Sequence, residues 1–137
     1  MGVRGGGNII RNLRVLGVAL KKDCTLEVLK AVTQTELKAK QRVPVDNSPL
    51  KTSIYHDMDY PKILGEVGAK EFYAPFVEFG TGTNVEVPNG YEDFAMKFYV
   101  NGKGTLMPRP FLIPAFLEEK QKFVQNIKNL VTKYSGR

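Results

Sequence analysis

The sequence contains very few of the residues on which most catalytic and metal sites depend. Cys24 is the only cysteine, so a disulfide within one chain is excluded. His56 is the only histidine, so these two residues cannot supply a Cys/His zinc site. A Cys–His or Ser–His nucleophile would need His56 as its base, and no serine or cysteine lies in a catalytic family pattern. We therefore expect no enzymatic activity, no metal and no cofactor.

Long apolar runs are missing as well. No stretch is apolar over the length that a bilayer-spanning helix needs. Arginines and Asn12 interrupt the apolar residues near the beginning, and no small-residue cleavage site follows them. The residues after Gly2 lack the Ser or Thr of a myristoylation signal. We expect a soluble protein with no export signal and no membrane partner.

What is present fits one folded domain over residues 1–137, because 137 residues suffice for a single core. Lys and Arg number 20 against 14 Asp and Glu, a net charge of +6. This excess suits proximity to nucleic acid or to an acidic protein surface. For any single basic cluster, a solvated helix face is the favoured interpretation. These clusters are Arg11, Arg14, Lys21 and Lys22; Lys38, Lys40 and Arg42; and Lys120, Lys122, Lys128 and Lys133.

Two segments have the apolar spacing of long helices. The first runs from Thr25, as its N-cap, to Arg42, and Pro44 ends it. The second runs from Pro110 or Ile113 to Tyr134 and carries the clearest apolar face. A short helix is also predicted from Ile9, capped by Asn8.

Extended segments lie between these helices. Strands are predicted at 53–58, 63–67 and 95–100, with Asn101-Gly102 as a hairpin turn and 103–107 as the return strand. Residues 1–7 are rich in glycine and are expected to be flexible, and 81–93 are expected to form a protruding loop. The predicted fold class is α+β: a small antiparallel sheet packed against two long helices, with a protruding loop and β-hairpin.

Candidate chemical sites each have a simpler structural interpretation. Gly80-Thr81-Gly82 lacks P-loop spacing and reads as a sharp turn. Glu78, among aromatics, could be a general acid, but a structural carboxylate is favoured, bonded to turn amides or paired with Arg109. We reject a metal site, because the candidate carboxylates lack EF-hand spacing. They are Asp57, Asp59, Glu92 and Asp93.

Three motifs in order carry a resemblance to a known family. They are VPVDNSPLKTSI, YAPFVEFGTG and MPRPFLIPAFLEEKQKF. The succession resembles the head–tail joining (neck or tail-completion) proteins of long-tailed bacteriophages, over roughly residues 25–130. The matching residues are Pro44, Val45, Asp46, Leu50, Ser53 and Ile54; Tyr73, Ala74, Val77, Glu78, Phe79, Gly80 and Thr81; and Arg109, Pro110, Phe111, Leu112, Pro114 and Ala115. Asn47-Ser48-Pro49 departs from the family's Thr-Gly.

The resemblance implies a structural virion protein without catalysis. It would form a homo-oligomeric ring, a hexamer or a dodecamer, in the neck between capsid and tail, after assembly in the host cytoplasm. Its partners would be head-closure or connector proteins, tail proteins, and DNA that passes through the lumen. The alternative is a small basic nucleic-acid-binding protein, and a hydrolase built around Glu78 is a remote third.

The loop after Thr81 is the predicted contact surface between ring subunits. It carries Val85, Val87, Pro88 and Tyr91 among polar residues, without a periodicity that would bury them in the chain's own core. Loops on a rigid scaffold are common contact surfaces. The predicted 95–107 hairpin would add a strand edge that a neighbour could extend.

Overall fold

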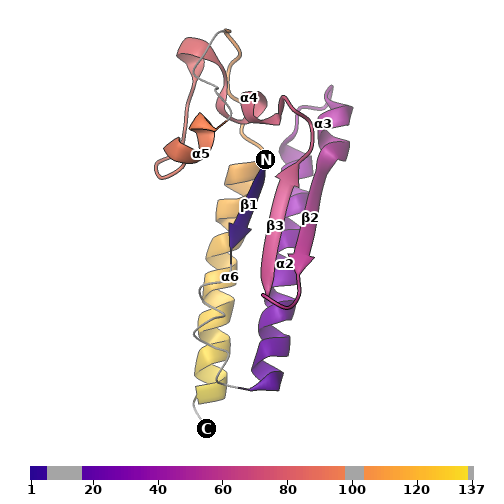
Figure 1. Ribbon diagram of the computed structural model, residues 1–137, viewed down its shortest axis with the longest axis vertical. Coiled ribbons are helices and arrows are strands. Elements are labelled where there is room, and N and C mark those ends of the chain that lie inside the picture. Colours follow the sequence, from indigo (N-terminus) through magenta and orange to yellow (C-terminus); the bar gives the residue numbers. More distant parts are fainter. Residues whose placement is uncertain (6–16, 98–103, 136–137) are drawn as a thin grey trace.

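A three-stranded antiparallel sheet lies against two long antiparallel helices in the computed structural model, which describes residues 1–5, 17–97 and 104–135 (Figure 1). The helices are α2 (Val18–Arg42) and α6 (Leu112–Ser135). The strands are β1 (Gly2–Gly5), β2 (Ile54–Asp59) and β3 (Leu64–Ala69), in the order β1-β3-β2. The predicted fold class, α+β with two long helices on a small antiparallel sheet, is confirmed.

Helix α2 buries one continuous face, as its apolar spacing predicts. The buried residues are Leu20, Cys24, Val28, Val32, Thr35 and Ala39. The hydroxyl of Thr35 donates to the carbonyl of Ala31 at 2.7 Å, so this buried polar group is satisfied. The predicted beginning at Thr25 is wrong: its hydroxyl donates to Lys21 O and does not cap the helix. The helix begins at Val18 because Leu20 and Cys24 extend its buried face toward the N-terminus.

Helix α6 closely matches its predicted bounds. Phe123 and Ile127 pack against Cys24 and Val28 of α2, so the two helices share one apolar cluster. No helix within the described ranges is both long and apolar enough to cross a membrane. The helix predicted from Ile9 lies outside the described residues.

Strand β1 of the sheet was not predicted from the sequence. Residues 2–5, expected to be flexible, form β1, in which Val3 pairs with Val67 of β3 and is buried. The carbonyl of Met1 also accepts from the amide of Ala69 at 2.9 Å. The four-residue strand is too short and too rich in glycine to show a pattern, and hydrogen bonds to a distant strand define it.

The strand predicted at 95–100 is wrong for its described part. Residues 92–96 form the short helix α5 (Glu92–Met96), in which the amide of Ala95 donates to Tyr91 O at 2.9 Å. Helix formation buries Ala95 against Phe79 and Ile113, which outweighs the local strand preference. The turn at 101–102 lies outside the described residues, and 104–107 form no regular element.

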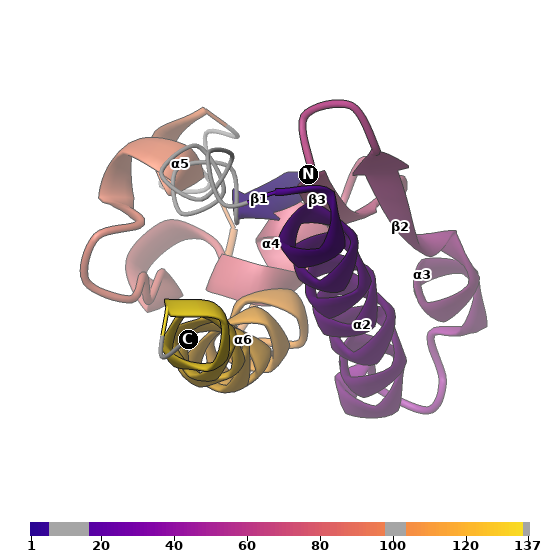
Figure 2. The same ribbon diagram turned by 90° about the horizontal axis from the view of Figure 1, so that it is seen from below.

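Three short elements gather at the end of the molecule where α6 begins: α3 (Ser48–Ser53), α4 (Ala74–Phe79) and the 3₁₀ turn η2 (Gly82–Asn84). Both views place α5 and α3 on opposite sides of α4 (Figures 1 and 2). Helices α2 and α6 lie on one face of the sheet in the end-on view (Figure 2). Residues 74–79 of the second motif form α4.

Candidate functional site

The first feature of the candidate site is a buried carboxylate at the start of α6. Glu78 of α4 is only 2% exposed. Its Oε1 accepts from the amides of Leu112 at 2.7 Å and Ile113 at 3.4 Å, and its Oε2 accepts from the amide of Phe111 at 3.2 Å. The first amides of a helix have no partner within the helix, so Glu78 satisfies them from a distant part of the chain.

The structural interpretation of Glu78 holds, but pairing with Arg109 is wrong. Within the described ranges Arg109 forms no ion pair, and its side chain is exposed. The hydrogen bonds found for Glu78 all come from backbone amides. The partial positive charge at a helix N-terminus attracts carboxyl oxygens, so the position of Glu78 at the beginning of α6 is favourable.

Burial and hydrogen bonding act on Glu78 in opposite directions. Burial raises its pKa to about 7, while the three amides, and to a smaller extent the charge of Arg42, favour the ionised form. A raised pKa is typical of a general acid, but such a group must reach a substrate. A side chain that is 2% exposed and fully engaged by amides has no room for one.

Backbone contacts join the second and third motifs directly. The amide of Arg109 donates to Val77 O at 2.7 Å, and the amide of Thr81 donates to Leu106 O at 2.9 Å. The amide of Leu106 in turn donates to the Thr81 hydroxyl at 2.8 Å. Gly80 has a φ of 77°, and a Cβ there would lie 2.9 Å from Pro108 Cδ. The Gly-Thr-Gly turn is therefore filled by another chain segment, which fits the predicted sharp turn better than a phosphate site.

Asn47 joins the first motif to the second. Its side-chain oxygen accepts from the amide of Leu50 at 3.2 Å, which caps α3, and from the Tyr73 hydroxyl at 3.0 Å. In the sequence, Asn47 stands out only as a departure from the family pattern. An Asn two residues before a proline is nevertheless a typical helix beginning, and that pattern could have identified the cap. We call this junction of the three motifs the corner; it comprises Asn47, Tyr73, α4 with Glu78, and the chain at the beginning of α6.

Other predicted motif residues divide into a buried set and an exposed set. Buried are Ala74, Phe79, Gly80 and Phe111; partly buried are Pro44, Tyr73, Thr81 and Pro114; exposed are Asp46, Arg109 and Pro110. The exposed residues contribute little to the core, so any role for them must be found at the surface.

The predicted interface residues are partly used inside the chain. Val85, Val87 and Tyr91 pack against a small core of Phe79, Ala95 and Ile113. The expectation that the chain's own core could not bury them is wrong for these three, because α5 folds back and supplies the missing partners. Pro88 is exposed. Whether any of them contacts a neighbour stays a prediction.

Cys24 and His56, the residues on which nucleophilic catalysis would depend, serve different parts of the fold. The Cys24 thiol is buried between α2 and α6, and burial raises its pKa, which makes it a poor nucleophile. The Nδ1 of His56 lies 3.1 Å from Glu36 Oε1 on the sheet side of α2. The structure gives no sign of a shared site for these residues.

The basic end of α2 is largely neutralised by α6. Lys38 Nζ lies 2.7 Å from Glu118 and 3.1 Å from Glu119, and Arg42 lies 3.0 Å from Glu118. The hydrogen bond from Lys38 lowers the pKa of Glu118. This cluster is therefore a helix–helix contact, which makes it a poor nucleic-acid site.

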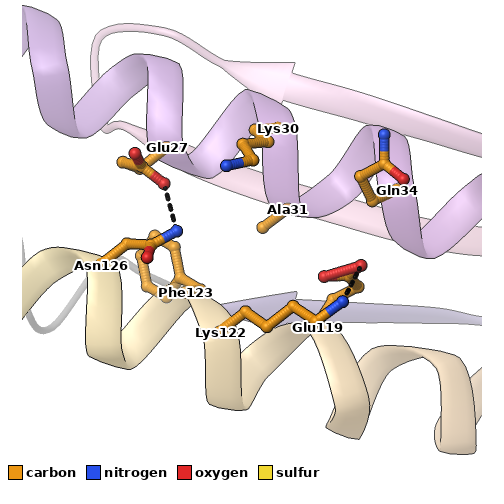
Figure 3. A pocket seen from close by; sticks show the side chains of 8 residues that line it. All are labelled: Glu27, Lys30, Ala31, Gln34, Glu119, Lys122, Phe123 and Asn126. Carbon is orange, nitrogen blue, oxygen red and sulfur yellow. Dashed lines mark hydrogen bonds and ion pairs between the residues drawn. The ribbon is translucent and has the colours of Figure 1, made fainter.

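A groove of about 330 Å³ lies between the two long helices (Figure 3). Its lining residues are Glu27, Lys30, Ala31, Gln34, Glu119, Lys122, Phe123 and Asn126. Asn126 donates to Glu27 at 3.0 Å, and Lys122 lies 3.7 Å from Glu119, so the rim satisfies much of its own charge. Across the described ranges, no three His, Cys, Asp or Glu residues gather as metal ligands.

The carboxylates that were considered and rejected as a metal site lie on different elements. Asp57 and Asp59 lie on β2 and accept from the nearby amides of Met58 and Lys62, whereas Glu92 belongs to α5 and accepts from Gly90.

No protein-family model, curated protein or solved structure matches the chain.

Proposed function

We propose that the chain is a structural subunit of a tailed-bacteriophage virion, one copy in a ring at the neck that joins the DNA-filled capsid to the tail. The corner is the observation that supports this proposal. Three motifs, separated by long stretches of sequence, meet there through Asn47, Tyr73, Glu78 and the chain before α6. The residues that suggest the family are thus also the ones that organise this end of the fold.

The same geometry favours a scaffold over a hydrolase. Glu78 would be the acid of any such enzyme, yet its oxygens are engaged by amides and shielded from solvent. A rigid corner at one end of two long helices instead suits a subunit that presents surfaces to neighbours. Hexameric or dodecameric assembly, head-closure or connector proteins, and tail proteins as partners belong to this proposal.

A second candidate, a small basic nucleic-acid-binding protein, is favoured by one feature of α6. From Lys120 to Ser135 the helix carries no Asp or Glu, while its lysines lie at 120, 122, 128 and 133. Cationic side chains neutralise phosphates without reading sequence. In the ring proposal, the same half of α6 would face DNA in the lumen.

Light scattering during size-exclusion chromatography and negative-stain electron microscopy of the purified chain separate the two candidates. A ring subunit should give a closed oligomer as its concentration rises. A chain that stays monomeric at the highest soluble concentration, and shifts DNA in a salt-sensitive way as a monomer, would refute the ring and support the second candidate.

A further inference from the structure

We propose that copies of this chain associate head to tail through two unlike surfaces beside the corner. The first, the shoulder, consists of Val45, Asp46 and Phe72. The second, the arm segment, is residues 106–109, with Leu106, Met107 and Arg109. The inference rests on the proposed function in requiring a second copy as the partner.

The shoulder presents large apolar groups that the fold holds in place. Val45 is fully exposed and Phe72 is 83% exposed. The Phe72 ring meets the Tyr73 ring edge-on at 5.4 Å, and the Tyr73 hydroxyl bonds to Asn47. The amide of Asn47 closes a turn onto Pro44 O at 2.9 Å, and this turn carries Val45 and Asp46. Exposed apolar groups that form a contiguous patch beside polar residues typically mark contact sites.

Backbone hydrogen bonds also hold the arm segment against the rest of the chain. Leu106 and Arg109 use their backbones to bond Thr81 and Val77, while Leu106 is 47% exposed and Met107 is 60% exposed. Leu106, Met107 and Arg109 are all exposed, so this short segment presents apolar groups and a cationic group together.

Charge complementarity identifies a second copy as the occupant. Asp46 and Arg109 are both exposed, and neither has an ion pair in the part of the chain that the structure describes. A guanidinium and a carboxylate form a geometrically specific, bidentate pair. Each surface thus offers apolar groups beside one uncompensated charge, and the charges have opposite sign.

The positions of the two surfaces favour a ring. The shoulder adjoins the beginning of α4 through Tyr73. The arm segment adjoins the end of α4 through Val77 and Thr81. Because the surfaces differ and lie at opposite ends of one element, their contact is heterologous. Heterologous contacts produce a ring when the rotation between copies closes.

Disulfide trapping tests which positions meet. Val45→Cys and Met107→Cys are made separately in the full chain, mixed and oxidised; the native Cys24 is buried and serves as an internal background. We expect a cross-linked dimer in the mixture, and neither variant alone should reach that yield. Thr132→Cys, at the far end of α6, replaces Met107→Cys in the control and should give no dimer with Val45→Cys.

Charge reversal tests the proposed pair. Asp46→Arg and Arg109→Asp should each weaken self-association by about tenfold, which is about 1.4 kcal/mol, and the double variant should restore it. Sedimentation equilibrium gives the dissociation constants. Circular dichroism of each variant shows whether the fold is retained, as exposed positions predict.

Three outcomes would overturn the inference. Val45→Cys dimers as abundant as the mixed dimer would indicate a symmetric contact. Oligomers that form without the 45–107 cross-link would place the interface elsewhere and leave the ring proposal standing. A chain that remains monomeric, gives no cross-link and binds DNA as a monomer would overturn both proposals.

Discussion

The body of the molecule and its corner are held together by different kinds of interaction. In the body, α2 and α6 meet through aliphatic and aromatic side chains such as Val28, Phe123 and Ile127. At the corner, α4 meets the beginning of α6 through a buried carboxylate and backbone amides. Apolar burial has no preferred direction, whereas hydrogen bonds weaken steeply when their angle changes. The corner therefore depends on the orientation of its groups, and the body depends on the volume of its side chains.

The largest expected effect compares one aromatic from each region. Phe111→Ala at the corner and Phe123→Ala in the body should each lower the free energy of unfolding by about 3–5 kcal/mol, because both side chains are buried. Phe111→Ala should be the more damaging, since the Phe111 side chain is fully buried whereas that of Phe123 is 8% exposed. Urea denaturation followed by circular dichroism measures both. A smaller loss at Phe111 than at Phe123 would contradict the contrast between the regions.

The next effect isolates the carboxylate. Glu78→Ala leaves three amides without their acceptor and should cost about 3 kcal/mol, since each unsatisfied buried donor costs about 1–3 kcal/mol and neighbouring losses are not additive. Glu78→Gln keeps one acceptor oxygen and should cost about half as much. Equal losses in the two variants would show that side-chain volume, and not hydrogen bonding, explains the effect.

A pH titration should distinguish the corner from the body. Because the pKa of Glu78 is raised from 4.5 to about 7 in the folded chain, its stabilising contribution is complete below pH 4.5 and is lost as the pH rises through 7. At about 1.4 kcal/mol per pKa unit, the loss is on the order of 3 kcal/mol. The advantage of wild type over Glu78→Gln should therefore be about half of the Glu78→Ala loss at pH 5, and it should shrink and then reverse as the pH rises to 8. Unfolding curves across this range would contradict the assignment if the difference stayed constant, whereas Phe123→Ala should show no such narrowing.

The smallest effect concerns the link between the first two motifs. Tyr73→Phe removes only the hydroxyl that donates to Asn47 and should cost about 1 kcal/mol. Asn47→Ala removes both that bond and the cap of α3, so its cost should be about 2 kcal/mol. Thermal unfolding of both single variants and the double variant measures their coupling. Fully additive losses would indicate that the two side chains act independently.

The contrast between the regions also explains which features could be predicted from the sequence. Periodic burial predicted α6 and most of α2, because a repeating apolar face is a local property. The link between Glu78 and Leu112 spans 34 residues and leaves no periodic trace, so the sequence predicts a structural carboxylate but leaves turn amides and Arg109 open as its partners. The bond from Tyr73 to Asn47 likewise leaves no local trace, because it spans 26 residues. The position of Asn47 as the cap of α3, in contrast, could have been predicted from the sequence.

Strand prediction failed where pairing was distant. Val3 joins the sheet through Val67, and the short, glycine-rich segment around Val3 contains no sign of that partner. At Ala95, local strand preference was overridden by packing against Phe79 and Ile113. Both errors came from tertiary contacts that outweigh local propensity.

The pairing of β1 with β3 has a consequence for how the chain folds during synthesis. Strand β1 leaves the ribosome well before its partner, because Arg4 and Glu66 lie 62 residues apart. The partner of helix α2 is synthesised even later, since the Tyr134 hydroxyl of α6 donates to Asp23 across 111 residues. Contacts this remote form late, because a long loop must close before they add stability. A nascent chain that ends before α6 therefore exposes the apolar face of α2, and this intermediate is the form that chaperones would have to protect from aggregation.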